Sequence, residues 1–118
     1  MNTQALADKL TSLLKEGQFE TIYNDLFDHE KVAHIEPQSP HFPHLVGVKA
    51  IREKDAQMSA QIAEVQELKV GEAIVSKDFF AIPYRISFTT KNSDTVTLDE
   101  LIVYQVADGK IIAEQFFY

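Results

Sequence analysis

The chain contains no cysteine. It therefore has no disulfide framework and no site in which a thiolate acts as nucleophile or metal ligand. Its four glycines are scattered singly, so the chain has no glycine-rich phosphate loop, dinucleotide fingerprint or nucleophile elbow. We expect no nucleotide cofactor and, more broadly, no cofactor.

Long apolar runs and excess positive charge are also missing. Apolar stretches span only a few residues, far short of the roughly 20 that cross a bilayer, so we expect no membrane partner. Eleven basic against eighteen acidic side chains give a net charge of −7, which repels phosphate backbones and argues against nucleic acid. The polar start lacks the features of a signal peptide, so we expect a cytoplasmic protein.

What the chain does have is an ordinary globular composition. Its 118 residues are 45% hydrophobic and 25% charged, values typical of one folded domain. We therefore expect a single domain over residues 1–118.

Two amphipathic stretches open the chain. We predict a helix over residues 4–16, with Thr3 as its N-cap and Gly17 at its end, and a shorter helix over residues 19–27. Both carry apolar residues at helical spacing: Leu6, Leu10, Leu13 and Leu14, then Phe19, Ile22, Tyr23, Leu26 and Phe27.

The middle of the chain predicts a short strand, a loop and a long helix. Residues 32–36 have the β-branched content of a strand that Pro37 ends. Residues 37–47 form a proline-restricted loop. After Gly47, apolar residues keep helical spacing over about five turns, from Val48 to Val65.

From residue 68 onward the apolar period changes from three or four to two. This alternation predicts four antiparallel strands over residues 68–75, 79–89, 95–106 and 111–118, separated by turns of which Asp108-Gly109 is the strongest. Pro83 has no amide donor, so its strand should lie at an edge or carry a bulge there; we favour a bulge. The element order is that of an α+β domain.

The order and particular residues of these elements resemble the SnoaL-like branch of the nuclear transport factor two-like superfamily, which includes ketosteroid isomerases. The residues that carry the resemblance span almost the whole chain: Gln18–Tyr23, Ala33–Pro37, Gly47–Arg52, Asp99–Tyr104, Asp108–Ile112 and Glu114–Tyr118. The resemblance implies a cone-shaped cystatin-like fold, in which a curved, mostly antiparallel sheet and about three N-terminal helices enclose one pocket. It implies a reaction much less strongly, because this fold hosts many functions.

Glu100 is the first candidate catalytic residue. It shares a strand face with the apolar Leu98, Ile102 and Tyr104, where a carboxylate is costly unless it is hydrogen-bonded or protonated. The resemblance to ketosteroid isomerases implies a protonated acid that donates to an oxyanion, a case that is a standard example of pKa tuning. The alternative is a solvated carboxylate near the start of the hairpin.

His34 and Glu36 are the other two candidate catalytic residues. They lie two apart on a predicted strand and so share a face, which permits an imidazole–carboxylate pair for proton transfer. In the isomerase pattern the general base falls one residue later, where this chain has Pro37, and the tyrosine donor of the first helix has no counterpart. Ketosteroid isomerisation by the usual pair of residues is therefore disfavoured.

Aromatic side chains are the candidate ligand contacts. Tyr23, Tyr84 and Tyr104 could offer phenolic donors in an apolar cavity, although tyrosines at core spacing also serve packing alone. Phe42, with Leu45, could close over the pocket as a lid. The set His34, Glu36, His41 and His44 matches no standard ligand spacing, so we expect no metal site.

The opposite face of the Glu100 strand carries Leu101, Val103 and Gln105, which are too apolar for an open sheet face. We therefore expect a homodimer through the outer face of the sheet. Arg85 should also face outward. The sequence indicates a pocket for a small apolar or aromatic ligand, with cofactor-free acid–base isomerase, lyase or cyclase chemistry as the leading hypothesis. A non-catalytic metabolite binder and a protein-interaction module remain the alternatives.

Overall fold

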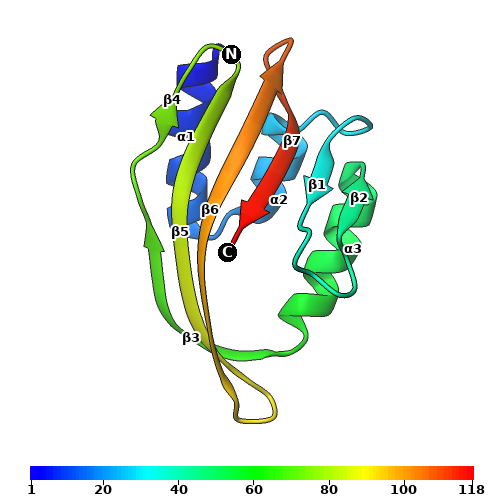
Figure 1. The fold of residues 1–118 in the computed structure, drawn as a ribbon, viewed down its shortest axis with the longest axis vertical. Coiled ribbons are helices and arrows are strands. Elements are labelled where there is room, and N and C mark those ends of the chain that lie inside the picture. Colours follow the sequence, from blue (N-terminus) through cyan, green and yellow to red (C-terminus); the bar gives the residue numbers. More distant parts are fainter.

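The computed structural model describes residues 1–118 as helices packed inside one strongly curved sheet (Figure 1). The helical elements are α1 (Thr3–Glu16), α2 (Phe19–Thr21), the π-helical turn η1 (Ile22–Leu26) and α3 (Val48–Ser59). The strands are β1 (Ala33–Ile35), β2 (His44–Val46), β3 (Ile62–Val70), β4 (Ile74–Val75), β5 (Phe79–Thr90), β6 (Thr95–Ala107) and β7 (Lys110–Phe117).

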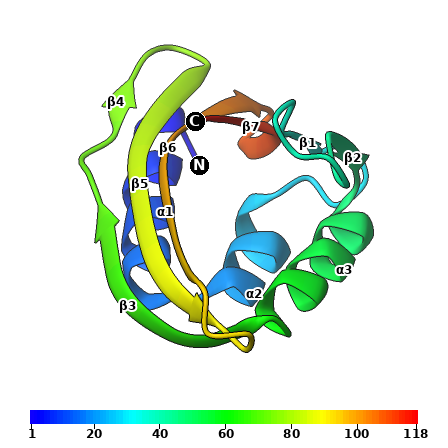
Figure 2. The same cartoon turned by 60° about the horizontal axis from the view of Figure 1, so that its bottom comes forward.

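The sheet has the strand order β2-β1-β7-β6-β5-β3, with β4 also paired to β5. All pairs are antiparallel except β1 with β7. Figure 2 shows the sheet curling around α1, with α2 and α3 closing the open side of the curl. This arrangement confirms the predicted α+β fold with a curved, mostly antiparallel sheet and three N-terminal helices. No helix is long and apolar enough to pass through a bilayer.

The first helix ends as predicted but begins differently. Gly17 takes φ 68° and donates its N–H to the carbonyls of the last turn, a left-handed cap that glycine adopts without strain. The N-cap is Asn2, not Thr3, because the Asn2 carboxamide accepts from the Ala5 N–H at 2.8 Å. Thr3 instead lies in the helix and donates its hydroxyl to the Lys77 carbonyl at 2.7 Å.

The long helix was predicted too long. It ends at Ser59, and Ile62 already belongs to β3. Two register shifts in β3, between Ile62 and Glu64 and between Val65 and Glu67, give β3 one extra residue each. Ile62, Val65 and Leu68 therefore face the same way although they lie three apart, a spacing that imitates a helix.

Three other predictions about the strands were also wrong. The loop over residues 37–47 contains the short strand β2, and the strand expected over residues 68–75 is divided into the end of β3 and β4. The pairing of β5 with β6 runs without a shift through Pro83, so no bulge lies there. Pro83 instead faces the break between β3 and β4, where its carbonyl accepts from the Gly71 N–H at 2.8 Å.

A further bulge lies in β7. Gln105 pairs with Ala113 but Val106 pairs with Ile111, so Ile112 is an extra residue. Ile111 and Glu114 consequently both face the helices, although simple alternation would put them on opposite faces. The hairpin turn before β7 has positive φ at Asp108 (52°) and Gly109 (74°), as a type I′ turn requires.

The core lies between the helices and the concave face of the sheet. Its fully buried members include Leu6, Leu10, Leu26, Phe27, Val32, Ile51, Phe80, Ile82 and Ile111. The convex face carries no helix (Figure 2). There Leu101 and Phe117 are directly paired across β6 and β7 and are 41% and 46% exposed.

Candidate functional site

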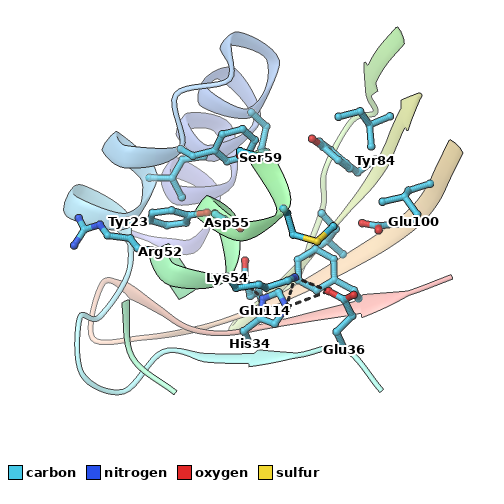
Figure 3. Close-up of a pocket in the computed structure, with 18 of the residues that line it drawn as sticks. Tyr23, His34, Glu36, Arg52, Lys54, Asp55, Ser59, Tyr84, Glu100 and Glu114 are labelled. Carbon is cyan, nitrogen blue, oxygen red and sulfur yellow. Dashed lines mark hydrogen bonds and ion pairs between the residues drawn. The ribbon is translucent and has the colours of Figure 1, made fainter. Parts of the chain in front are cut away.

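A cavity of about 390 Å³ opens between the helices and the concave face of the sheet. This volume is near the lower end of the range for small-molecule sites, about 300–1,000 Å³. Most of its lining is hydrophobic, from α1, η1, α3, β5 and β6. A few polar side chains interrupt this lining in two groups (Figure 3).

The first group is a hydrogen-bonded network of four side chains from three elements. His34 of β1 contacts Glu114 of β7 through Nδ1 at 2.7 Å. Its Nε2 atom lies 2.9 Å from the Lys54 Nζ atom of α3 and 3.1 Å from Glu36 Oε1. Lys54 also donates to Glu36 Oε1 at 2.8 Å. Because His34, Lys54 and Glu114 are all at least nine-tenths buried, these contacts are shielded from water.

Protonation in this network is set by the two carboxylates. Burial disfavours a charge on His34, but its hydrogen bonds to Glu114 and Glu36 outweigh burial and raise its pKa. Burial likewise opposes ionisation of Glu36, yet hydrogen bonds from His34, Lys54 and Tyr118 lower the pKa of Glu36 to about 2. Glu36 is therefore a carboxylate at neutral pH.

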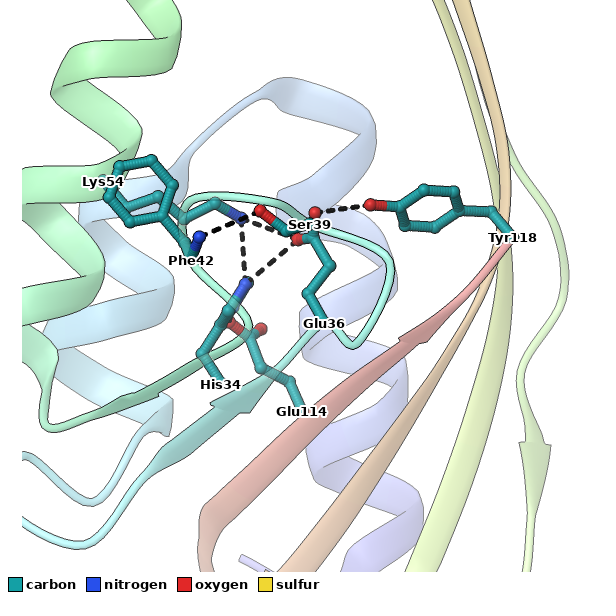
Figure 4. Close-up of polar contacts among 7 residues, drawn as sticks. All are labelled: His34, Glu36, Ser39, Phe42, Lys54, Glu114 and Tyr118. Atoms are coloured by element: carbon teal, nitrogen blue, oxygen red, sulfur yellow. Dashed lines mark hydrogen bonds and ion pairs between the residues drawn. The ribbon is translucent and has the colours of Figure 1, made fainter.

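Tyr118 extends the network toward the surface, as Figure 4 shows. Its hydroxyl donates to Glu36 Oε2 at 2.6 Å. Partial burial and the adjoining carboxylate raise the pKa of Tyr118, so the phenol stays protonated. Glu36 thus receives hydrogen bonds at both oxygens.

The second polar group consists of side chains that face the cavity with few partners: Glu100, Tyr84 and Asp55 (Figure 3). Glu100 lies on β6 among apolar neighbours, and burial, followed by the charge of Glu36, raises its pKa to about 7. Tyr84 is its cross-strand partner on β5. Burial and the nearby carboxylates Glu100 and Asp55 raise the pKa of Tyr84 to about 12, which keeps the phenol a donor.

Asp55 faces the cavity from α3. Burial, and then the charges of Glu114 and Glu20, raise its pKa to about 7. The cavity therefore holds two carboxyl groups, Asp55 and Glu100, that exchange protons near neutral pH, one from the helical wall and one from the sheet.

The sequence-predicted residues largely meet at this cavity. His34, Glu36, Glu100, Tyr23, Tyr84 and Tyr104 all line it. Tyr104 is 2% exposed and stacks on Phe80 with ring centroids 4.9 Å apart, so it also serves packing. Phe42 does not line the cavity: it lies in the loop before β2, where its N–H donates to the Ser39 hydroxyl at 3.0 Å.

Neither His41 nor His44 lines the cavity, and no set of three or more histidine, aspartate and glutamate side chains is arranged to hold a metal ion. Arg85 faces outward as predicted and pairs with Glu67 and Asp99 at 2.8 and 3.3 Å.

The sequence analysis did not identify four polar residues of the site: Lys54, Asp55, Glu114 and Tyr118. Lys54 and Asp55 continue the buried spacing of Val48 and Ile51 on α3, and charged residues at core spacing were the available signal. The sequence pattern gave no such signal for Glu114, because the extra residue Ile112 changes the sheet face on which Glu114 lies.

Comparisons with known proteins agree with this fold. The model of the SnoaL-like domain matches residues 1–118. Among functionally curated proteins, none matches the sequence.

Solved structures with the same fold include a protein assigned to the SnoaL-like polyketide cyclases from Mesorhizobium loti. It is 28% identical over all of both chains, with a TM-score of 0.91. A protein with a cystatin-like fold from Xanthomonas campestris is 19% identical over 99% of this chain and 90% of its own, with a TM-score of 0.80. A protein with a ketosteroid isomerase-like fold from Catenulispora acidiphila is 16% identical over 79% and 69%, with a TM-score of 0.65.

Proposed function

Since the chain belongs to the SnoaL-like domain family, we propose that its pocket binds a small apolar carbonyl compound and transfers a proton at the carbon beside the carbonyl group. Enolisation of this kind is the shared first step of cofactor-free isomerases, lyases and cyclases. The observation that carries the proposal is a carboxyl group, Glu100, with a pKa of about 7 in an otherwise apolar cavity wall.

Glu100 and Tyr84 are suited to hold the carbonyl oxygen. They are cross-strand partners on the concave face, and at neutral pH the phenol and a large share of the carboxyl groups carry a proton to donate. As the neighbouring C–H bond breaks, negative charge develops on the oxygen and both hydrogen bonds strengthen. Preorganised donors of this kind lower the barrier because they need no rearrangement during the reaction.

Asp55 is suited to take the proton from carbon. It faces the cavity from α3, and a base works best when its pKa lies near the working pH. His34 is hydrogen-bonded at both ring nitrogens in the resting structure. In this proposal His34 and Glu36 therefore act from the network and do not contact the carbon directly.

The cavity also supports a small ligand over a protein partner. It has a volume of about 390 Å³ and a mainly hydrophobic lining. Such a space is suited to a compound of one or two rings, and two carboxyl groups with a pKa near 7 are unusual in a purely structural core.

Hydrogen–deuterium exchange tests the proposal without knowledge of the natural substrate. A panel of aryl ketones and cyclic enones is incubated with the protein in deuterated buffer at pH 7, and deuterium at the carbon beside the carbonyl is measured by NMR. Removing one preorganised donor to a developing oxyanion costs about 100- to 1,000-fold, so Glu100→Ala, which leaves no donor at this position, should slow exchange by about 100-fold or more.

Asp99→Ala is the matched control, because Asp99 is the exposed neighbour of Glu100 on β6 and faces away from the cavity. It should exchange the panel at the wild-type rate. Panel compounds that bind to the wild-type protein but exchange no faster than in buffer would refute the enolisation proposal and favour a non-catalytic binder.

A further inference from the structure

Lys54 has the surroundings of a nucleophile. Its Nζ atom lies 2.9 Å from His34 Nε2, and the other ring nitrogen of His34 lies 2.7 Å from Glu114. A nucleophile, a base within hydrogen-bond reach and a third group that orients the base form the general pattern of covalent catalysis. Here the three groups come from α3, β1 and β7.

Lys54 also differs from every other lysine in the chain. It is 9% exposed and lines the cavity, whereas the other lysines are exposed on the surface. One ion pair with Glu36 would account for a buried ammonium group. The additional contact with a histidine nitrogen that can accept a proton is what a nucleophilic amine requires.

We propose that Lys54 attacks the carbonyl carbon of the bound compound and forms an iminium ion with it. The proposal rests on the proposed function in one respect, that the pocket takes a carbonyl compound. It adds a covalent intermediate and assigns His34 and Glu114 to the activation of Lys54.

The first step starts from neutral His34, whose proton lies on Nδ1 toward Glu114, and transfers a proton from the Lys54 ammonium to the free Nε2 atom. Glu36 Oε1 contacts both nitrogens, at 2.8 and 3.1 Å, so the positive charge keeps its carboxylate partner as it moves. The second carboxylate, Glu114, holds the other side of the imidazolium. Lys54 is left with a free electron pair on Nζ.

In the second step the Nζ–C bond forms, and the carbonyl oxygen takes a proton from the Glu100 carboxyl group. The nitrogen then returns one of its protons to Glu100. Glu100 protonates the hydroxyl group, the C–O bond breaks, and water leaves. The products are the iminium ion, the His34 imidazolium, the Glu100 carboxylate and one water molecule, so atoms and charge balance.

An iminium ion draws electrons from the neighbouring carbon more strongly than a ketone does. The C–H bond that Asp55 would break is therefore more acidic in the covalent intermediate. The buried Lys54 amine and the half-buried Asp55 carboxyl group face the same cavity from neighbouring positions of α3, as this chemistry requires.

Reductive trapping tests the proposal. The wild-type protein is incubated with each panel ketone and sodium cyanoborohydride, which reduces an iminium ion to a stable secondary amine, and the modified peptide is mapped by mass spectrometry. We expect one adduct, on Lys54. Because an adjacent base activates a lysine, Lys54 should be labelled at least about 10-fold faster than the exposed Lys49 of the same helix.

Three variants distinguish the nucleophile Lys54, the positioning residue Glu114 and the background labelling of other lysines. Lys54→Arg keeps the positive charge but cannot form an iminium ion, so the adduct should disappear. Lys49→Arg should leave labelling of Lys54 unchanged. Glu114→Gln should slow labelling of Lys54 while a ligand-observed NMR assay still detects binding, because Glu114 only orients and stabilises His34. Circular dichroism checks that each variant folds. The mapping of the adduct on the wild-type protein does not depend on any variant.

The outcomes distinguish the two proposals. Binding by NMR without an adduct on Lys54, or labelling spread evenly over the surface lysines, overturns the iminium proposal and leaves the enolisation proposal standing. Neither binding nor an adduct with any panel compound overturns both. An adduct on Lys54 that Glu114→Gln slows and Lys54→Arg abolishes supports the proposal.

Discussion

Replacing Glu100 by glutamine should stabilise the folded protein at pH 8 and change its stability much less at pH 5. Burial raises the pKa of Glu100 from 4.5 to about 7. At pH values between these two pKa values, the folded state holds a proton that the unfolded state has lost. The stability of the folded state therefore decreases as pH rises through this window. Glutamine resembles the protonated acid and has no such loss.

The size of the effect follows from the pKa difference. At about 1.4 kcal/mol per pKa unit, a rise from 4.5 to about 7 corresponds to about 3 kcal/mol of lost stability at pH 8. Glu100 is 9% exposed and shares its surroundings with Glu36, Lys54, His34 and Glu114, whose charges act on it from β1, α3 and β7. The figure of about 3 kcal/mol is an upper bound, because the folded protein can admit water around a charged carboxylate.

The assay is urea unfolding of the wild-type protein and Glu100→Gln at pH 5 and pH 8. The free energies of unfolding should differ by no more than about 1 kcal/mol at pH 5, just above the unfolded-state pKa of 4.5, and the advantage of the variant should grow to as much as about 3 kcal/mol at pH 8. Asp55 also has a pKa of about 7, but it is present in both proteins and cancels in the difference. An equal effect of the substitution at both pH values would refute the argument that Glu100 is protonated by burial.

Two further predictions concern Tyr118, at the surface end of the network, and the convex face of the sheet. Tyr118→Phe removes the 2.6 Å hydrogen bond to Glu36, so the pKa of Glu36 should rise from about 2 toward 4.5; an NMR titration that finds no rise would contradict the described network. On the convex face, Leu101→Glu should convert a dimer into a monomer in sedimentation experiments, because Leu101 and Phe117 form an exposed apolar pair there. A wild-type monomer would show that this face does not join two chains.

Most of the fold could be predicted from the sequence because local signals and the final packing agree. Gly17 ends the first helix, Asp108-Gly109 turns the last hairpin, and strict alternation from Phe79 to Val106 gives β5 and β6 the predicted facing. The facing of Glu100 followed from the same alternation. The predictions failed at the end of the long helix and missed Glu114 because an extra residue in the backbone changes the period on which the argument depends.

The site could also be predicted only in part, for different reasons. His34 and Glu100 lie on regular strands and Glu36 directly follows β1, and each of the three lines the cavity. Lys54 and Asp55 lie on α3 at core spacing, but a charged residue there is ordinarily assigned to solvent. The partnership of His34 with Glu114 spans 80 residues of sequence and depends on the parallel pairing of β1 with β7, which no local pattern specifies.

The extra residue Ile112 also bears on how chains of this fold should be compared. The alternation of β7 side chains between the cavity and the convex face shifts by one residue at Ile112. A sequence alignment that places its gap one position away from Ile112 therefore equates a residue that faces the cavity with one on the convex face. An insertion or deletion in β7 would therefore change which β7 side chains line the cavity, without any substitution. Equivalent residues of related chains are better matched by the sheet face on which they lie than by their distance along β7 from the Asp108-Gly109 turn.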